Sequence, residues 1–241
     1  MITCDPPLPR RHGSAAEVAE LADLALILDS DVHIAIWRRP TDRRITDLLA
    51  RPESRLTRPS RLVARSADPA LARRIAGLVP EAATRSDPTG ATTLAADAYD
   101  LCGAFAELVA ADELMISLEE PDEATCPRFH VDKVGIRMLV TYCGPGTEWL
   151  THEHVDRRWL GEAGMDRPDE QDGAMRPGAT VQRAPTFAVV LLKGEAWPGA
   201  RGFGAVHRSP DPGREPRTLL RVDMLSQQPL GIATTTTETA P

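Results

Sequence analysis

The chain has 241 residues, which suits one medium-sized domain with a sizeable core, and 42% of them are hydrophobic. The net charge of −7 disfavours nucleic acid as a partner. No apolar run reaches the roughly 18 residues that a membrane span needs, and the N-terminal sequence MITCDPPLPRRHGS lacks the apolar segment of a secretion signal. We therefore expect a cytoplasmic protein without a membrane partner.

Helical patterns predominate in residues 1–112. Apolar residues recur at helical spacing in residues 14–29, where Ser14 and Glu17 fit a capping box. The first 112 residues are thus predicted to form a mainly helical part that packs on the rest of the fold. The other elements predicted in this part are a strand over 31–40 and helices over 41–52, 68–80 and 91–111.

Short strands separated by Gly and Pro follow from residue 113 to residue 225. Their succession without a helical period predicts an antiparallel sandwich or barrel, and so an α+β fold overall. The predicted strands span residues 113–121, 127–132, 135–146, 179–194, 202–210 and 217–225.

Two segments interrupt or follow these strands. Residues 151–177 are polar and charged, and we interpret them as an insertion of the kind that often forms a lid or binding loop. His152 and His154 in this insertion are candidates for a second metal site or a substrate contact, with a solvated loop as the alternative. Residues 226–241 have low complexity and are predicted to be a disordered tail.

His130 and Asp132 stand two residues apart in a predicted strand. Side chains at positions i and i+2 of a strand point to the same face, so an imidazole nitrogen and a carboxylate oxygen can converge on one cation. His207, at the end of a later predicted strand, is the candidate third ligand. Two histidines and one carboxylate suit a facial triad for non-haem Fe(II), and zinc in a catalytic site is the competing assignment.

Four features in order resemble the Fe(II)- and 2-oxoglutarate-dependent dioxygenase superfamily. They are the pair in FHVD (129–132), the glycine turn GPGTEWL (144–150), the distal histidine in AVHRSP (205–210), and Arg217 about ten residues beyond it. The resemblance covers roughly residues 113–225. The combined layout also resembles an uncharacterised bacterial family of unknown function, which supplies no substrate.

The resemblance implies a double-stranded β-helix, that is, a jelly-roll or cupin-like barrel. It implies that His130, Asp132 and His207 bind Fe(II) as catalytic metal ligands and that 2-oxoglutarate serves as cosubstrate. The far carboxylate of 2-oxoglutarate needs a cation, and the planar guanidinium of arginine binds carboxylates in a bidentate manner. Arg217 and Arg221 share one strand face, and the spacing favours Arg217 for this role.

Three functions remain open at this point. The first is a hydroxylase or demethylase of this superfamily, acting on a small molecule or a protein. The second is a non-redox, cupin-like protein that binds a metal or a small acid without turnover. The third is a zinc hydrolase that uses the same triad. Arg217 favours the first, because a hydrolase has no need of a cation after the distal histidine.

Overall fold

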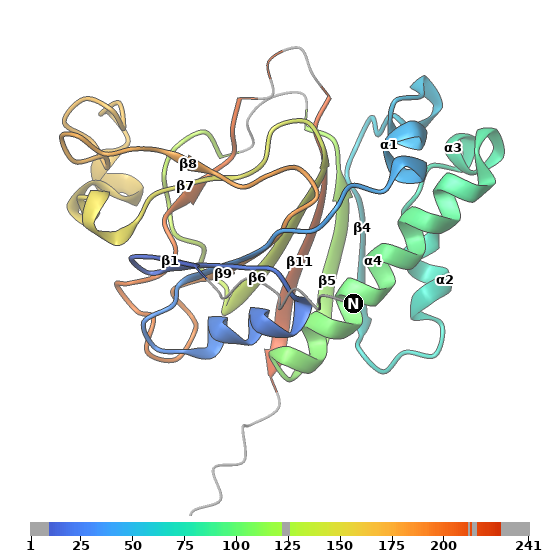
Figure 1. Ribbon diagram of the computed structural model, residues 1–241, viewed down its shortest axis with the longest axis horizontal. Coiled ribbons are helices and arrows are strands. Elements are labelled where there is room, and N and C mark those ends of the chain that lie inside the picture. The colour runs from blue at the N-terminus through green and yellow to red at the C-terminus, as the bar shows by residue number, and fades with distance from the viewer. Residues whose placement is uncertain (1–9, 122–125, 212, 214–215, 228–241) are drawn as a thin grey trace, which may run out of the picture.

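One large sheet runs through the centre of the computed structural model, which describes residues 10–121, 126–211, 213 and 216–227. Strands β9, β6, β11 and β5 lie side by side in its middle (Figure 1). Neighbouring strands are antiparallel except for the parallel pair of β2 and β3. In order across the sheet the eight strands are β1 (Arg10–His12), β2 (Ala15–Val18), β3 (Ile34–Trp37), β9 (Val189–Lys193), β6 (Ile136–Cys143), β11 (Thr218–Gln227), β5 (Ala111–Glu119) and β4 (Ser60–Arg65).

Helices pack on one face of this sheet. The longest begins after Asp87, whose side chain accepts a hydrogen bond from the Gly90 N–H as an N-cap. Its buried residues recur at helical spacing, among them Leu94 and Leu101, and join the largest apolar cluster. The helices of this part are η1 (Leu21–Leu28), α1 (Arg43–Leu49), η2 (Pro52–Ser54), α2 (Leu71–Ala76), α3 (Glu81–Ser86) and α4 (Pro88–Leu108).

A small second sheet lies on the other face of the large one. The side chains of strand β11 alternate between the two faces of the large sheet. Leu220 and Val222 point to the helices and belong to the apolar cluster shared with them. Leu219 points the opposite way and packs in a second cluster with Leu139 of β6 and Trp149 of the small sheet. In order across it, the strands of the small sheet are β10 (His207–Arg208), β7 (Glu148–Trp149) and β8 (Gln182–Arg183).

The segment that precedes β6 reaches the edge of the small sheet. Of the strand predicted over 127–132, the structure forms an isolated antiparallel bridge between His130 and His207. The polar insertion leaves the small sheet after β7 and returns at β8. It contains the short helices η3 (His152–His154), η4 (Arg157–Trp159) and η5 (Gly161–Gly164).

The predicted α+β class is confirmed, but the mainly helical N-terminal part is not. Strands β1, β2, β3 and β4 all lie before residue 112 and pair into the large sheet. The capping box predicted at Ser14 is wrong, because Glu17 lies in β2 and accepts a hydrogen bond from Arg38 instead. Pairing of β2 with β3 and burial of its alanines override the helical pattern, and the helix there begins only at Leu21.

Strand β11 extends into the segment predicted as a disordered tail, since it ends at Gln227. The rest of that predicted tail, residues 228–241, lies outside the described residues. Over the part of the chain that the structure describes, no helix has the length and apolar character to cross a membrane.

Gly194, directly after β9, lets the backbone of the His130–Asp132 segment pass close by. A Cβ at Gly194 would stand 2.2 Å from the Val134 carbonyl oxygen and 2.7 Å from that of Asp132. Gly194→Ala is therefore expected to lower the free energy of unfolding by about 1–3 kcal/mol, the usual cost of overpacking. In Gly103→Ala, on α4, the new methyl group meets nothing within 4 Å, and we expect a gain of about 0.5–1 kcal/mol. Urea unfolding of both variants checks this, and equal effects would contradict it.

His33, directly before β3, gives a second prediction. Burial, helped by the positive charges of Lys193, His152 and Arg157, lowers its pKa to about 4. The unfolded chain then binds a proton near pH 6.5 that the fold refuses, so stability is full above pH 6.5 and falls as the pH drops towards 4. Between pH 8 and pH 5 we expect wild type to lose about 1–2 kcal/mol more than His33→Gln, allowing for solvent screening. Parallel pH dependences of unfolding in the two proteins would exclude this role.

Candidate functional site

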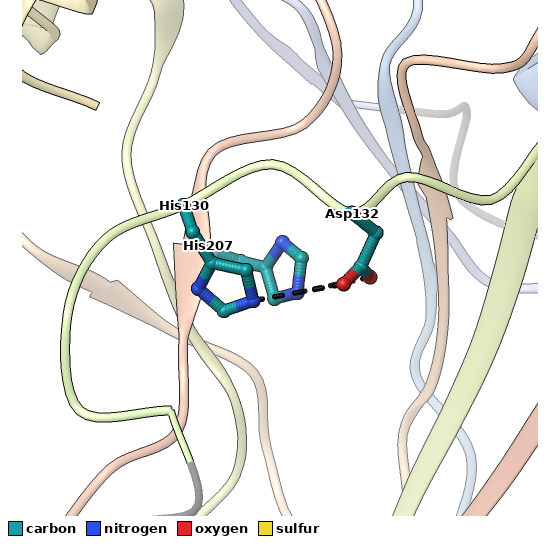
Figure 2. A group of neighbouring side chains, drawn as sticks. All are labelled: His130, Asp132 and His207. Carbon is teal, nitrogen blue, oxygen red and sulfur yellow. Dashed lines mark ion pairs between the residues drawn. The ribbon is translucent and has the colours of Figure 1, made fainter. Parts of the chain in front are cut away.

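His130, Asp132 and His207 meet between the two sheets. One ligand atom from each residue can be chosen such that all three atoms lie within 4.8 Å of one another. Figure 2 shows both imidazole rings directed towards the carboxylate. The backbone sets this arrangement, because His130 and His207 exchange two N–H to carbonyl hydrogen bonds of 3.0 Å and so stand directly opposite each other.

Hydrogen bonds to the backbone fix which nitrogen of each ring faces the centre. The Nδ1 of His130 lies 2.9 Å from the Arg128 carbonyl oxygen, and the Nδ1 of His207 lies 3.1 Å from that of Ala205. A carbonyl only accepts, so each Nδ1 carries the proton and each Nε2 keeps its lone pair in the neutral ring. The Nε2 atoms of His130 and His207 lie 3.6 and 3.3 Å from oxygens of Asp132. This is the tautomer of metal-binding histidines.

Asp132 is 8% exposed, and one of its two oxygens has no hydrogen-bond donor among the described residues. Burial alone would raise its pKa, but hydrogen bonds from His130 and His207 in their protonated forms and the charge of Arg137 prevail and hold the pKa well below its usual range. When both rings are neutral, the ionised carboxylate faces two imidazole nitrogens that offer lone pairs. Three electron-pair donors with one orphaned oxygen fit a divalent cation.

Arg137, at the start of β6, holds Asp132 in place. Its Nη1 donates to Asp132 Oδ1 at 2.6 Å, while its Nε and Nη2 donate to the two oxygens of Asp223 at 2.5 and 3.0 Å. The sequence did not identify this residue, because its role depends on the pairing of Arg137 with Asp223 across β6 and β11. The opposite charges of Arg137 and Asp223 in two predicted strands are the only signal of this contact, and the sequence does not give the register in which the two strands pair.

Arg217 is a buried guanidinium without an ion pair to any described carboxylate, and it is 2% exposed. Its Nε donates to the Pro145 carbonyl oxygen at 2.9 Å and its Nη1 to Ser209 Oγ at 3.0 Å. Its Nη2 lies 3.4 Å from the hydroxyl oxygens of both Thr141 and Thr147. Burial lowers its pKa to about 10, although the charge of Glu119 opposes the shift.

Arg221 shares a pocket with Arg217, His130 and His207 but is already paired. Its Nη2 lies 2.9 Å from a Glu119 oxygen, and its Nε lies 3.7 Å from an oxygen of Asp223. Of the two arginines predicted to bind the cosubstrate, Arg217 therefore has the unneutralised charge. The structure places it in the same pocket as the two histidines, as a cosubstrate site requires.

His152 and His154 do not join the triad. His152 stacks on Phe203 with ring centroids 5.4 Å apart, and its Nδ1 lies 3.3 Å from Arg157 Nη2. His154 Nδ1 lies 2.9 Å from the Thr151 hydroxyl. Across the described residues, His130, Asp132 and His207 form the one group of three or more His, Cys, Asp or Glu side chains close enough to hold a metal.

Comparisons with known proteins give one family and several distant structures. The model of a family described as "Protein of unknown function (DUF1826)" matches residues 19–223, which confirms the predicted resemblance to a family of unknown function. No curated protein matches the sequence at a significant level.

Among solved structures, the chain is similar to a dioxygenase for auxin oxidation from rice, at 14% identity, over 90% of this chain and 84% of the other, with a TM-score of 0.44. For the corresponding Arabidopsis thaliana enzyme in complex with 2-oxoglutarate, the identity is 10% over 90% of this chain and 94% of the other, with a TM-score of 0.46. For a putative 2OG-Fe(II) oxygenase family protein from Caulobacter crescentus, the identity is 14% over 88% of this chain and 87% of the other, with a TM-score of 0.41. Likenesses this distant support no inference about activity, which depends on the side chains of the site.

Proposed function

We propose that the chain, which belongs to the DUF1826 family of proteins of unknown function, is an Fe(II)- and 2-oxoglutarate-dependent oxygenase of the hydroxylase or demethylase type. One observation carries the proposal: two of the three convergent ligands, His130 and His207, line one pocket together with the buried, unneutralised Arg217. A bound metal would account for the three ligands but not for Arg217. A buried guanidinium without a carboxylate partner is costly unless an anion binds there.

The fold that goes with this function is a double-stranded β-helix. Its support is the pair of facing sheets with an apolar cluster between them, formed by residues such as Leu139, Leu219 and Trp149. The triad stands at the small sheet, where the bridge from His130 to His207 extends its edge. The pocket that His130 and His207 line together with Arg217 is the proposed place of the cosubstrate.

Each residue then has a defined task. His130, Asp132 and His207 would hold Fe(II) on one face and leave the other positions open, and Arg137 would keep Asp132 ionised and oriented. Arg217 would bind the far carboxylate of 2-oxoglutarate through its guanidinium. When bound, Fe(II) and 2-oxoglutarate would supply the activation of O₂ for oxidation of a substrate.

Turnover of 2-oxoglutarate tests the proposal. Protein loaded anaerobically with Fe(II), then given O₂ and 2-oxoglutarate, is expected to form succinate, and the zinc-loaded protein is not. Ester hydrolysis by the zinc form without succinate from the iron form would favour the hydrolase. Metal binding with neither reaction, together with failure to bind 2-oxoglutarate, would leave a non-redox binding protein.

A further inference from the structure

Asp169 is a buried carboxylate in the polar insertion, although its neighbours in the chain are exposed. It is 4% exposed, and its backbone carbonyl accepts a hydrogen bond of 2.9 Å from the Met175 N–H. A buried carboxylate is unfavourable unless its oxygens are hydrogen-bonded or paired with cations. The hydrogen-bond partners of the Asp169 carboxylate therefore identify the part of the protein to which the insertion is attached.

Those partners lie in the segment directly before His130. One oxygen of Asp169 accepts the Phe129 backbone N–H at 2.9 Å. The other accepts from the Arg128 guanidinium, with Nη2 at 3.0 Å and Nε at 3.3 Å. The remaining Nη1 of Arg128 donates to the Met165 carbonyl oxygen at 2.7 Å, so both acceptors of this guanidinium belong to the insertion.

The same segment orients the first histidine ligand. The carbonyl oxygen of Arg128 accepts the Nδ1 proton of His130 and so points Nε2 towards Asp132. Asp169 holds the residue that supplies this carbonyl through its side chain, and the next residue through its N–H. A shift of either would rotate the imidazole of His130.

Asp169 also contacts the residue that follows the second histidine ligand. The Nη1 of Arg208 lies 3.8 Å from a carboxylate oxygen of Asp169. The guanidinium of Arg208 stacks on the Phe129 ring, 4.3 Å from its centroid, and Nε donates to Glu148 of β7 at 2.7 Å. One carboxylate thus contacts residues next to both His130 and His207.

We propose that Asp169 is a positioning residue that uses the insertion to fix the geometry of the two histidine ligands. This inference rests on the proposed metal site, and it assigns to the insertion a role in shaping the metal centre in addition to any contact with substrate. Outer partners of metal ligands typically change metal affinity by about 10- to 100-fold when they are removed.

Binding of Co(II), a stable substitute for Fe(II) with a visible ligand-field spectrum, separates this role from a purely structural one. Asp169→Asn keeps the size of the side chain and removes its charge. We expect Co(II) affinity to fall by about 10- to 100-fold, with a changed spectrum at saturation. The matched control is Asp166→Asn, which alters an exposed carboxylate of the same insertion and should leave affinity and spectrum unchanged.

Near-ultraviolet circular dichroism and melting temperature monitor folding in all three proteins. If Asp169→Asn melts earlier but binds Co(II) with wild-type affinity and spectrum, Asp169 is structural only and the inference is wrong. Wild-type protein that binds no Co(II) would instead overturn the metal site itself, and the inference with it. The two failures are therefore distinguishable.

Discussion

His207→Ala is expected to weaken Fe(II) or Co(II) binding by at least about 100-fold, beyond the range typical for losing an outer partner. The substitution removes one of three protein ligands and leaves a site that cannot form a facial triad. Asp132→Asn should have a comparable effect, because it keeps the shape of the side chain but removes the charge that faces the two imidazoles. Calorimetric titration under anaerobic conditions measures both.

His154→Ala is the matched control for the loss of a histidine. It lies in the insertion, bonds to Thr151 and has no place in the triad, so metal affinity should stay at the wild-type value. Because His207 is buried, circular dichroism must show that His207→Ala is folded. Wild-type metal affinity in folded His207→Ala and Asp132→Asn would place the metal elsewhere or exclude it.

Arg217→Met is expected to weaken 2-oxoglutarate binding to the metal-loaded protein by about 1.5–3 kcal/mol, roughly 10- to 150-fold, the range for a hydrogen bond to a charged group. Metal affinity should change little, since Arg217 makes no contact with the triad in its hydrogen bonds. The same variant should melt no earlier than wild type without ligand. Its buried charge has no carboxylate partner, and replacing such a charge with an apolar side chain is often neutral or stabilising.

Arg221→Met provides the comparison, because this arginine is neutralised by Glu119. Its removal leaves a buried carboxylate without its partner, so the free energy of unfolding should fall while 2-oxoglutarate affinity changes less than in Arg217→Met. Calorimetry for 2-oxoglutarate and thermal unfolding separate the two arginines. Wild-type 2-oxoglutarate affinity in both variants would remove the cosubstrate site and leave a metal-binding scaffold.

The sequence predicted the convergence of His130, Asp132 and His207 better than the elements around them. His130 and Asp132 are close along the chain, so their convergence needed little knowledge of the fold, although the segment forms only a bridge at His130 and not the predicted strand. His207 followed from a strand end and a resemblance. Arg137 and Asp169 act through tertiary contacts with Asp223 and with the backbone before His130. Neither the register of two strands nor the path of a long insertion can be derived from the spacing of residues in the sequence.

The N-terminal half shows where prediction of the secondary structure from the sequence failed. Residues 14–29 have apolar residues at a spacing compatible with a helix, but their first part pairs in parallel with β3 and completes the large sheet. A four-residue strand rich in alanine carries almost no local signal, and a non-local partner decides its structure. The later strands β5, β6 and β11, rich in long aliphatic residues, lie where they were predicted. The strand predicted over 179–194 instead divides into β8 and β9, the one over 202–210 is reduced to β10, and residues 127–132 form only the bridge at His130.

The most direct test of the account is a titration of 2-oxoglutarate into anaerobic, Fe(II)-loaded protein, followed by visible absorption. A 2-oxo acid that chelates Fe(II) through its carboxylate and keto oxygen gives a charge-transfer band, whereas succinate, which lacks the keto oxygen, cannot. We predict a saturable band with 2-oxoglutarate in wild type, a weaker affinity in Arg217→Met, and no band in His207→Ala. Wild-type protein that binds Fe(II) but shows no band at saturating 2-oxoglutarate would contradict the proposed function.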